Sequence, residues 1–129
     1  MALGSKIRGS LLVMLLAGLL ALAVQVVAKA EPLKATYYGN WYAGKPTASG
    51  ELYDPHGFTA AHPYLPFGTK LLVSYNGRGV IVTVNDRIPY EGNYDLDLSW
   101  AAAKAVGLTD IGTAVVAAEV IETQLVSSA

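Results

Sequence analysis

Four titratable side chains have the types and positions that could do chemistry in this chain of 129 residues, namely Glu51, His62, Asp86 and Asp97. Asp86 stands in Asn85-Asp86-Arg87, directly after the β-branched run 80–84, and this pattern predicts a rigid strand that ends in a carboxylate. Asp97 follows in the next polar segment. Carboxylates and imidazoles held in fixed positions are the usual general acids and bases of enzymes. The pattern therefore favours acid–base chemistry near the end of that strand.

Each of these side chains also has a structural interpretation. Asp86 could cap a turn or pair with Arg87. His62 follows two alanines and could be a histidine whose hydrogen bonds are satisfied within the fold. Glu51 lies in a glycine-bearing loop, where a solvated carboxylate is common. Asp97 lies two residues before a predicted helix N-cap and could stabilise the helix N-terminus. Taken singly, none of them identifies a function.

Several other kinds of site are not supported by the sequence. The chain has no cysteine and only two histidines, so no metal-ligand spacing is present, and we expect no metal and no cofactor. No serine lies in a Gly-x-Ser-x-Gly elbow. Gly77-Arg78-Gly79 precedes no helix, which argues against a phosphate loop there. Without disulfides, stability must come from apolar packing.

Short elements are predicted to position these residues. The predicted strands are 34–39, 70–75, 80–84 and 113–121. Asn76-Gly77 predicts a tight hairpin between the second and third of them, because a type I′ turn needs positive φ at both positions. Ser99 and Gly107 predict the ends of a short helix. Residues 40–57 contain too many Gly and Pro residues for a regular element, and a loop of this length is often functional.

The first thirty residues have the layout of a secretory signal. Lys6 and Arg8 precede an apolar run over 11–24, and Ala28-Lys29-Ala30 offers small residues for cleavage. Gln25 interrupts the run before it reaches the roughly 18 to 20 residues that a membrane span needs. Cleavage after Ala30 is therefore favoured over a retained anchor. We predict a signal peptide over 1–30, one folded domain over 31–122 and a disordered tail over 123–129.

The predicted mature chain is acidic. Without Lys6, Arg8 and Lys29 it has six basic and ten acidic residues, a net charge of −4. A nucleic-acid-binding protein needs a basic patch to replace the counterions of phosphates. We therefore expect no nucleic-acid partner, and instead a neutral or weakly charged substrate outside the cytoplasm.

The predicted elements favour a mainly β fold. Several short strands, one tight hairpin and one small helix in about a hundred residues are typical of a small closed barrel. Closure removes the sheet edges that a secreted domain would otherwise expose. The fold class predicted from the residues is thus a small β-barrel.

Six motifs with characteristic spacing occur in order along the chain. They are Ala35-Thr36-Tyr37-Tyr38-Gly39, Thr47-Ala48-Ser49-Gly50-Glu51, Thr59-Ala60-Ala61-His62, Leu65-Pro66-Phe67-Gly68-Thr69, Val84-Asn85-Asp86-Arg87 and Asp97-Leu98-Ser99 followed by x-Ala-Ala. In these motifs the chain resembles the RlpA (rare lipoprotein A) family, over residues 35–121. The resemblance implies a six-stranded double-psi β-barrel with one or two short helices. The family motif has glycine where this chain has Ile88, so we expect strained backbone there or a loop of another shape.

The resemblance also implies an activity and a site. Members of the family are lytic transglycosylases that cut peptidoglycan glycan strands, and related barrels include expansins. The implied catalytic residues are Glu51, His62 and Asp86, and expansin-type relatives add Asp97. The residues expected to bind substrate are Tyr38, Trp41, Thr59, Arg87 and Tyr90. Tyr37 is a further candidate for stacking on sugar faces, although buried packing suits it equally well.

The leading hypothesis gives Asp86 two roles in turn. It would protonate the glycosidic oxygen and then take the proton of the sugar's own C6 hydroxyl, which leaves a 1,6-anhydro ring. Such an acid must be protonated when substrate arrives, through burial or a neighbouring negative charge. The alternatives are ordinary hydrolysis and a non-catalytic, expansin-like module that binds or loosens glycan. We expect peptidoglycan glycan strands as the partner, a secreted or periplasmic monomer, and no membrane anchor after signal cleavage.

Overall fold

The computed structural model describes residues 22–27, 29–89 and 92–127 in two units. In the smaller unit, β1 (Leu22–Val27) and β8 (Glu122–Ser127) form a two-stranded antiparallel ribbon. The larger unit, residues 28–121, contains a closed barrel. Most of the predicted signal peptide lies outside the described residues. Cleavage after Ala30 therefore stays a prediction. The disordered tail over 123–129 also stays a prediction, with residues 128 and 129 outside the described part of the chain.

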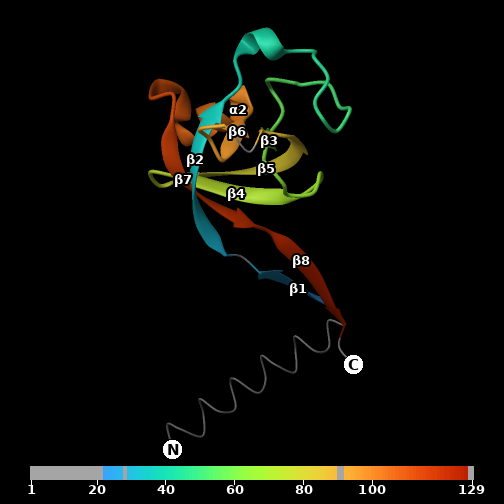
Figure 1. Ribbon diagram of the computed structural model, residues 1–129. Helices are drawn as coiled ribbons and strands as arrows, with labels where there is room; N and C mark the ends of the chain where they lie inside the picture. The colour runs from blue at the N-terminus through green and yellow to red at the C-terminus, as the bar shows by residue number, and fades with distance from the viewer. Residues whose placement is uncertain (1–21, 28, 90–91, 128–129) are drawn as a thin grey trace, which may run out of the picture. The chain divides into compact units, whose positions relative to one another are not determined.

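Six strands close the barrel in the order β2-β6-β3-β5-β4-β7 (Figure 1). These are β2 (Ala30–Tyr37), β3 (Thr59–Ala61), β4 (Lys70–Tyr75), β5 (Arg78–Asp86), β6 (Leu96–Leu98) and β7 (Ala114–Val120). The pairs β2–β6 and β3–β5 are parallel, and the other neighbours are antiparallel. The predicted mainly β, six-stranded barrel is confirmed.

The predicted hairpin and helix are also confirmed. Asn76 and Gly77 have φ values of 49° and 81° between β4 and β5. The helix α2 (Trp100–Val106) begins after Ser99, whose hydroxyl accepts a hydrogen bond from the Ala102 N–H, and ends at Gly107 with a φ of 83°. Two 3₁₀ turns, η1 (Asn40–Tyr42) and η2 (Leu108–Asp110), complete the elements. Among the described residues, no helix is both long and apolar enough to cross a membrane.

The core consists of small and branched apolar side chains from the barrel strands and α2. Its larger members are Leu71, Val73, Val82, Val84, Leu96, Leu98, Val106, Leu108 and Val116. Leu96 and Leu98 both point inward, so the residue between them faces the opposite side of β6. The core thus fixes the outward direction of Asp97.

A β-bulge interrupts the pairing of β5 with β3. Ala60 lies opposite Val84, but the next residue, Ala61, lies opposite Asp86, so Asn85 is the extra residue of β5. Unbroken alternation would have put Asp86 on the inner face with Val82 and Val84. Because a bulge shifts the side-chain alternation by one residue, Asp86 instead shares the outer face of Ala61. The bulge therefore turns this carboxylate out of the core.

Candidate active site

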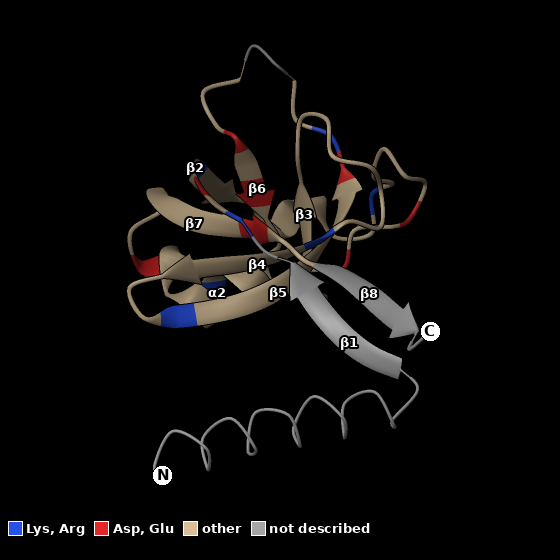
Figure 2. Cartoon of the chain, turned by 90° about the horizontal axis from the view of Figure 1, so that it is seen from below, with Lys and Arg blue, Asp and Glu red and all other residues tan. Residues whose placement is uncertain are grey.

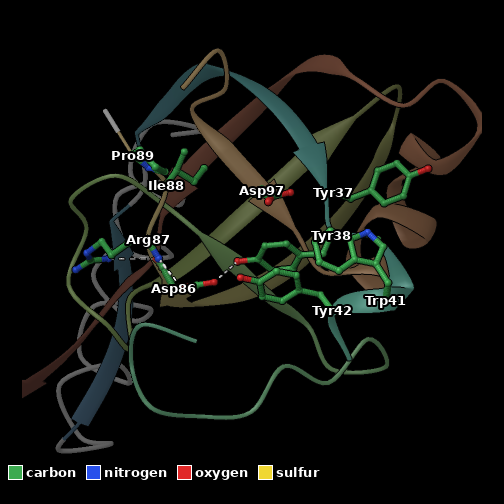
Figure 3. A pocket seen from close by; sticks show the side chains of 10 residues that line it. Tyr37, Tyr38, Trp41, Tyr42, Asp86, Arg87, Ile88, Pro89 and Asp97 are labelled. Carbon is green, nitrogen blue, oxygen red and sulfur yellow. Dashed lines mark hydrogen bonds between the residues drawn. The ribbon is translucent and has the colours of Figure 1, made fainter. Parts of the chain in front are cut away.

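A pocket of about 350 Å³ lies where β5 and β6 present their outward carboxylates. It is lined by Tyr37, Tyr38, Gly39, Trp41, Tyr42, Asp86, Arg87, Ile88, Pro89 and Asp97. Figure 3 shows the tyrosines and Trp41 approaching Asp86 from one side, with Arg87, Ile88 and Pro89 on the other. Two of the four predicted catalytic residues, Asp86 and Asp97, thus meet in one cavity.

The Asp86 carboxylate is held by three hydrogen-bond donors. The Tyr38 hydroxyl donates to Oδ2 at 2.6 Å, and the backbone N–H groups of Ala48 and Arg87 donate to Oδ1, each at 2.8 Å. The Ser49 N–H also donates to the Asn85 carbonyl, so the loop 47–51 is docked on the end of β5. An ionised carboxylate offers acceptors only, which suits a group surrounded by donors.

The two carboxylates belong to one row of paired residues across four strands, β5, β3, β6 and β2. Ala61 of β3 lies opposite Asp86 on one side and opposite Asp97 on the other, and Thr36 follows Asp97 in the row. Directly paired residues project from the same face of a sheet. The backbones that carry the two aspartates are therefore about 9 to 10 Å apart, which is two strand spacings. In this row, Ala61 lies between them.

Asp97 is the carboxyl group whose protonated form the site favours. It lies in the middle of β6, where Figure 2 marks an acidic position in red. Its Oδ1 atom is buried and has no hydrogen-bond partner among the described residues. Burial, followed by the negative charge of Asp86, raises the pKa of Asp97 to about 7. A carboxyl group in this state carries a proton that it can donate near neutral pH.

An aromatic cluster forms one wall of the pocket. The rings of Tyr38 and Tyr42 are stacked, with centroids 5.6 Å apart, and the Trp41 ring meets Tyr42 edge-on at 5.0 Å. Trp41 is 72% exposed, and the Lys45 ammonium lies 4.8 Å from its ring centroid. An exposed indole beside a carboxylate pair is suited to stacking on the apolar face of a sugar. Of the predicted stacking residues that the structure describes, Trp41 is therefore the best placed.

Gly39 gives Trp41 its position. A Cβ atom at residue 39 would lie 2.4 Å from the indole Nε1 and 2.6 Å from Cδ1. An alanine at this position would therefore displace the indole.

We expect Gly39→Ala to move the indole without unfolding the barrel. The variant should bind glycan about 3- to 10-fold more weakly, because an aromatic contact of this kind is worth roughly 1 kcal/mol. Isothermal titration with purified glycan strands measures the effect. Gly79→Ala is the control, since the nearest atom to its Cβ would be 3.5 Å away. Equal affinities for the two variants would contradict this role of Gly39.

The other predicted site residues lie elsewhere or at the margin. Glu51 is exposed and Thr59 is half-buried, and neither lines the pocket. Arg87 does line it, with its guanidinium 4.1 Å from the Phe67 ring centroid. Tyr90 lies outside the described residues. The roles of these four residues stay predictions.

His62 is buried, and its Nδ1 atom accepts hydrogen bonds from the N–H groups of Tyr64 and Leu65 at 3.2 and 3.1 Å. Burial, and then the charge of Arg87, lowers its pKa. The ring is therefore a neutral acceptor that fixes the turn after β3, and it does not line the pocket. Its predicted catalytic role is untested.

Ile88 has no left-handed backbone, since Asn76 is the one non-glycine residue with positive φ in the part of the chain that the structure describes. The loop after Arg87 thus takes a shape that a β-branched residue tolerates.

Sequence reasoning did not assign a role to Gly39, Tyr42, Ala48 or Ala61. The run of small residues around Ala61 was the available signal for a close approach of backbones. Ala48 contributes its backbone N–H, which the type of its side chain does not indicate.

Comparisons with known proteins agree with this architecture. A family model described as "Lytic transglycolase" matches residues 33–118. The chain is 47% identical over 90 residues to the endolytic peptidoglycan transglycosylase RlpA of Pseudomonas aeruginosa, which covers 68% of this chain and 26% of that protein. It is 46% identical over 89 residues to the protein of the same name from Neisseria meningitidis, covering 67% of this chain and 37% of that protein.

A solved structure also matches. The Streptomyces papain inhibitor is 27% identical, with a TM-score of 0.58, over 72% of this chain and 94% of that one. The closed barrel, with its two parallel strand pairs, is a double-psi β-barrel. The chain belongs to the RlpA-like lytic transglycolase family of such barrels. It spans about a quarter of the length of several curated relatives that it matches.

Proposed function

We propose that this protein is an endolytic lytic transglycosylase that cleaves peptidoglycan glycan strands in the cell envelope and leaves 1,6-anhydro-muramic ends. The observation that carries the proposal is the shared pocket of Asp86 and Asp97, in which one carboxyl group has a buried oxygen atom without a hydrogen-bond partner among the described residues and the other accepts three hydrogen bonds. One carboxyl group that can donate a proton and a second that can accept one are suited to the cleavage of a glycosidic bond.

The arrangement supports separate roles for the two aspartates, with Asp97 as the general acid and Asp86 as the general base. Asp97 donates its proton to the glycosidic oxygen as the bond from C1 to that oxygen breaks. The C6 hydroxyl of the same sugar then attacks C1, and Asp86 accepts the hydroxyl proton, so that no water is consumed. The proton on Asp86 returns to Asp97 by exchange with solvent, which completes the cycle. The sequence hypothesis assigned both steps to Asp86 alone.

The remaining features of the proposal follow from the site and the relatives. Trp41 holds the sugar on one side of the carboxylate pair, and Arg87 lines the other. Peptidoglycan is the substrate named for the relatives, and a cell-wall substrate implies action in the periplasm or at the cell wall. We further propose that the protein acts as a secreted monomer in cell-wall remodelling or daughter-cell separation.

The barrel alone does not decide between catalysis and binding. The similar Streptomyces protein is named as a papain inhibitor, which illustrates that one fold carries unrelated functions. The second candidate here is a non-catalytic module that binds or loosens glycan, and the exposed Trp41 would suit it as well. What favours catalysis is the placement of Asp97, since a partly buried carboxyl group beside a second carboxylate favours the protonated, proton-donating form, which a binding site does not need.

Mass spectrometry of the products tests the proposal. The purified protein should convert peptide-free glycan strands into fragments with anhydro ends, each lighter by one water than the hydrolysed fragment. Reducing ends without this loss of water would show a hydrolase. Glycan binding without any fragments, from correctly folded protein, would leave only the non-catalytic module. Boiled protein and a strand sample without protein are the controls.

A further inference from the structure

The Tyr38 hydroxyl reaches Asp86 across two intervening strands. Tyr38 follows directly after β2, whereas Asp86 ends β5, and β6 and β3 lie between those strands in the barrel. The hydrogen bond from Tyr38 Oη to Asp86 Oδ2 is nevertheless 2.6 Å long. The side chain must therefore extend over the ends of β6 and β3, towards the row in which Ala61 separates the two aspartates. Figure 3 shows it directed at Asp86.

Packing fixes the Tyr38 ring in this direction. Tyr42 is stacked on it at an interplanar angle of 9°, and the buried Tyr53 meets it edge-on with centroids 4.7 Å apart. The Tyr53 hydroxyl in turn accepts a hydrogen bond from the Trp100 N–H at the start of α2. This contact chain links the ring to the core of the domain. The Tyr38 hydroxyl is consequently a preorganised donor.

The same packing makes Tyr38 poorly suited to stack on a sugar, because the ring of Tyr42 already lies parallel to it. The exposed platform is Trp41. We propose that Tyr38 is a positioning residue, which holds the Asp86 carboxylate in its reactive orientation through the hydroxyl, rather than a sugar-stacking residue. Its kinetic role presupposes the proposed function, whereas its coupling to Asp86 does not.

The electrostatics of the pair support this role. Burial, and next the hydrogen bond and charge of Asp86, raise the pKa of Tyr38 far above its ordinary value. The hydroxyl therefore keeps its proton throughout the range in which the enzyme works, and it donates to Asp86 rather than competing for protons. Asp97 adds to the same shift, which places it close to Tyr38 as well.

An alkaline titration tests the coupling without any need for turnover. The near-ultraviolet absorbance of tyrosinate is followed in the wild type, Tyr38→Phe and Asp86→Asn, with circular dichroism to confirm that each remains folded. The chain has eight tyrosines, and two of them, Tyr38 and Tyr53, should ionise later than the others in the wild type, because burial raises the pKa of both. The contribution of Tyr38 should be missing in Tyr38→Phe and should appear at lower pH in Asp86→Asn, because the carboxylate charge is removed, whereas that of Tyr53 should remain in both variants. Identical titrations of the wild type and Asp86→Asn would overturn the proposal.

Steady-state kinetics on glycan strands test the consequence. Tyr38→Phe keeps the ring and removes only the hydroxyl, so kcat should fall about 10- to 100-fold, as expected for a lost hydrogen bond to a charged group, while KM stays within about twofold. Tyr75→Phe, which removes a tyrosine hydroxyl at the end of β4, is the control and should match the wild type. A raised KM with unchanged kcat in Tyr38→Phe would show a sugar-binding residue and overturn the positioning role. If the wild type binds glycan without turnover, the proposed function has failed and the titration alone decides the coupling.

Discussion

Replacing Asp97 by asparagine is expected to lower turnover about 10³-fold, which is within the usual range for removal of a general acid. Asparagine fills the same space but has no proton to give to the glycosidic oxygen. In the wild type, a carboxyl group with a pKa of about 7 loses its proton as the pH rises, so activity should decline above about pH 7. The residual activity of Asp97→Asn should lack this decline. A pH–rate profile of kcat/KM on glycan strands measures both effects.

The same substitution should stabilise the fold at higher pH. The pKa of Asp97 is raised from 3.8 to about 7, so the folded state holds a proton that the unfolded state has lost. Protonated Asp97 therefore contributes stability that is fully present below about pH 4 and is lost as the pH rises through 7. At pH 8, Asp97→Asn should exceed the wild type in unfolding free energy by on the order of 2 kcal/mol, after allowance for partial solvent access, and at pH 4 the advantage should vanish. Urea unfolding at both values checks this.

Asp95→Asn is the matched control for Asp97→Asn. Asp95 is exposed, two residues earlier in the same segment, and its Oδ2 accepts the Lys34 N–H at 2.9 Å. Its replacement should leave turnover within about twofold and should give no gain at pH 8. If Asp97→Asn keeps wild-type turnover, the acid lies elsewhere, and the single-carboxylate hypothesis for Asp86 becomes the better account.

Enlarging Ala61 is expected to have the second-largest effect. Ala61 is 1% exposed and occupies the position between the two aspartates in their row. Ala61→Val would push Asp86, Asp97 or the Tyr38 ring aside, and a displacement of about 1 Å in a catalytic group can cost about 10²-fold in rate. Overpacking of this kind should also cost about 1 to 3 kcal/mol of stability. Turnover and thermal unfolding are measured on the same preparations.

A smaller substitution separates misplacement from unfolding. Ala61→Ser adds a single oxygen and should lower both turnover and stability less than Ala61→Val. In both variants the loss of rate should exceed what the unfolded fraction explains at the assay temperature. A loss of turnover that follows the unfolded fraction alone would contradict the separating role of Ala61. Trp41→Ala, tested in parallel, should raise KM instead.

The longer elements of the fold were predictable because their signals are local. Asn76-Gly77 requires positive φ, and Ser99 and Gly107 have the side chains that helix ends need, so the hairpin and the helix could be placed. The strands β3 and β6 have three residues each, which is too short for an alternating pattern to be recognised. β2 begins at Ala30 rather than at residue 34, because Pro32 normally argues against a strand.

The site was predictable in part. Asp86 stood out as a carboxylate at the end of a strand, and the motifs that the chain shares with its family drew attention to Asp97. Asp86 and Asp97 lie in one row because strands that are distant in the sequence pair with each other, and because β5 contains a bulge that no local sequence pattern predicts. Likewise, Tyr38 could be predicted as a site residue, but its hydrogen bond to Asp86 depends on a barrel closure that only the folded chain contains.

The extra residue in β5 makes the site sensitive to chain length as well as to residue type. Deleting one residue between Val84 and Asp86 would restore the regular alternation of the strand and turn the carboxylate towards the core. A related protein that keeps the aspartate but lacks a residue equivalent to Asn85 would therefore retain the carboxylate in sequence and lose its place in the pocket. When such barrels are aligned, a single gap at Asn85 would therefore indicate an aspartate that faces the core, even though the aspartate itself is matched.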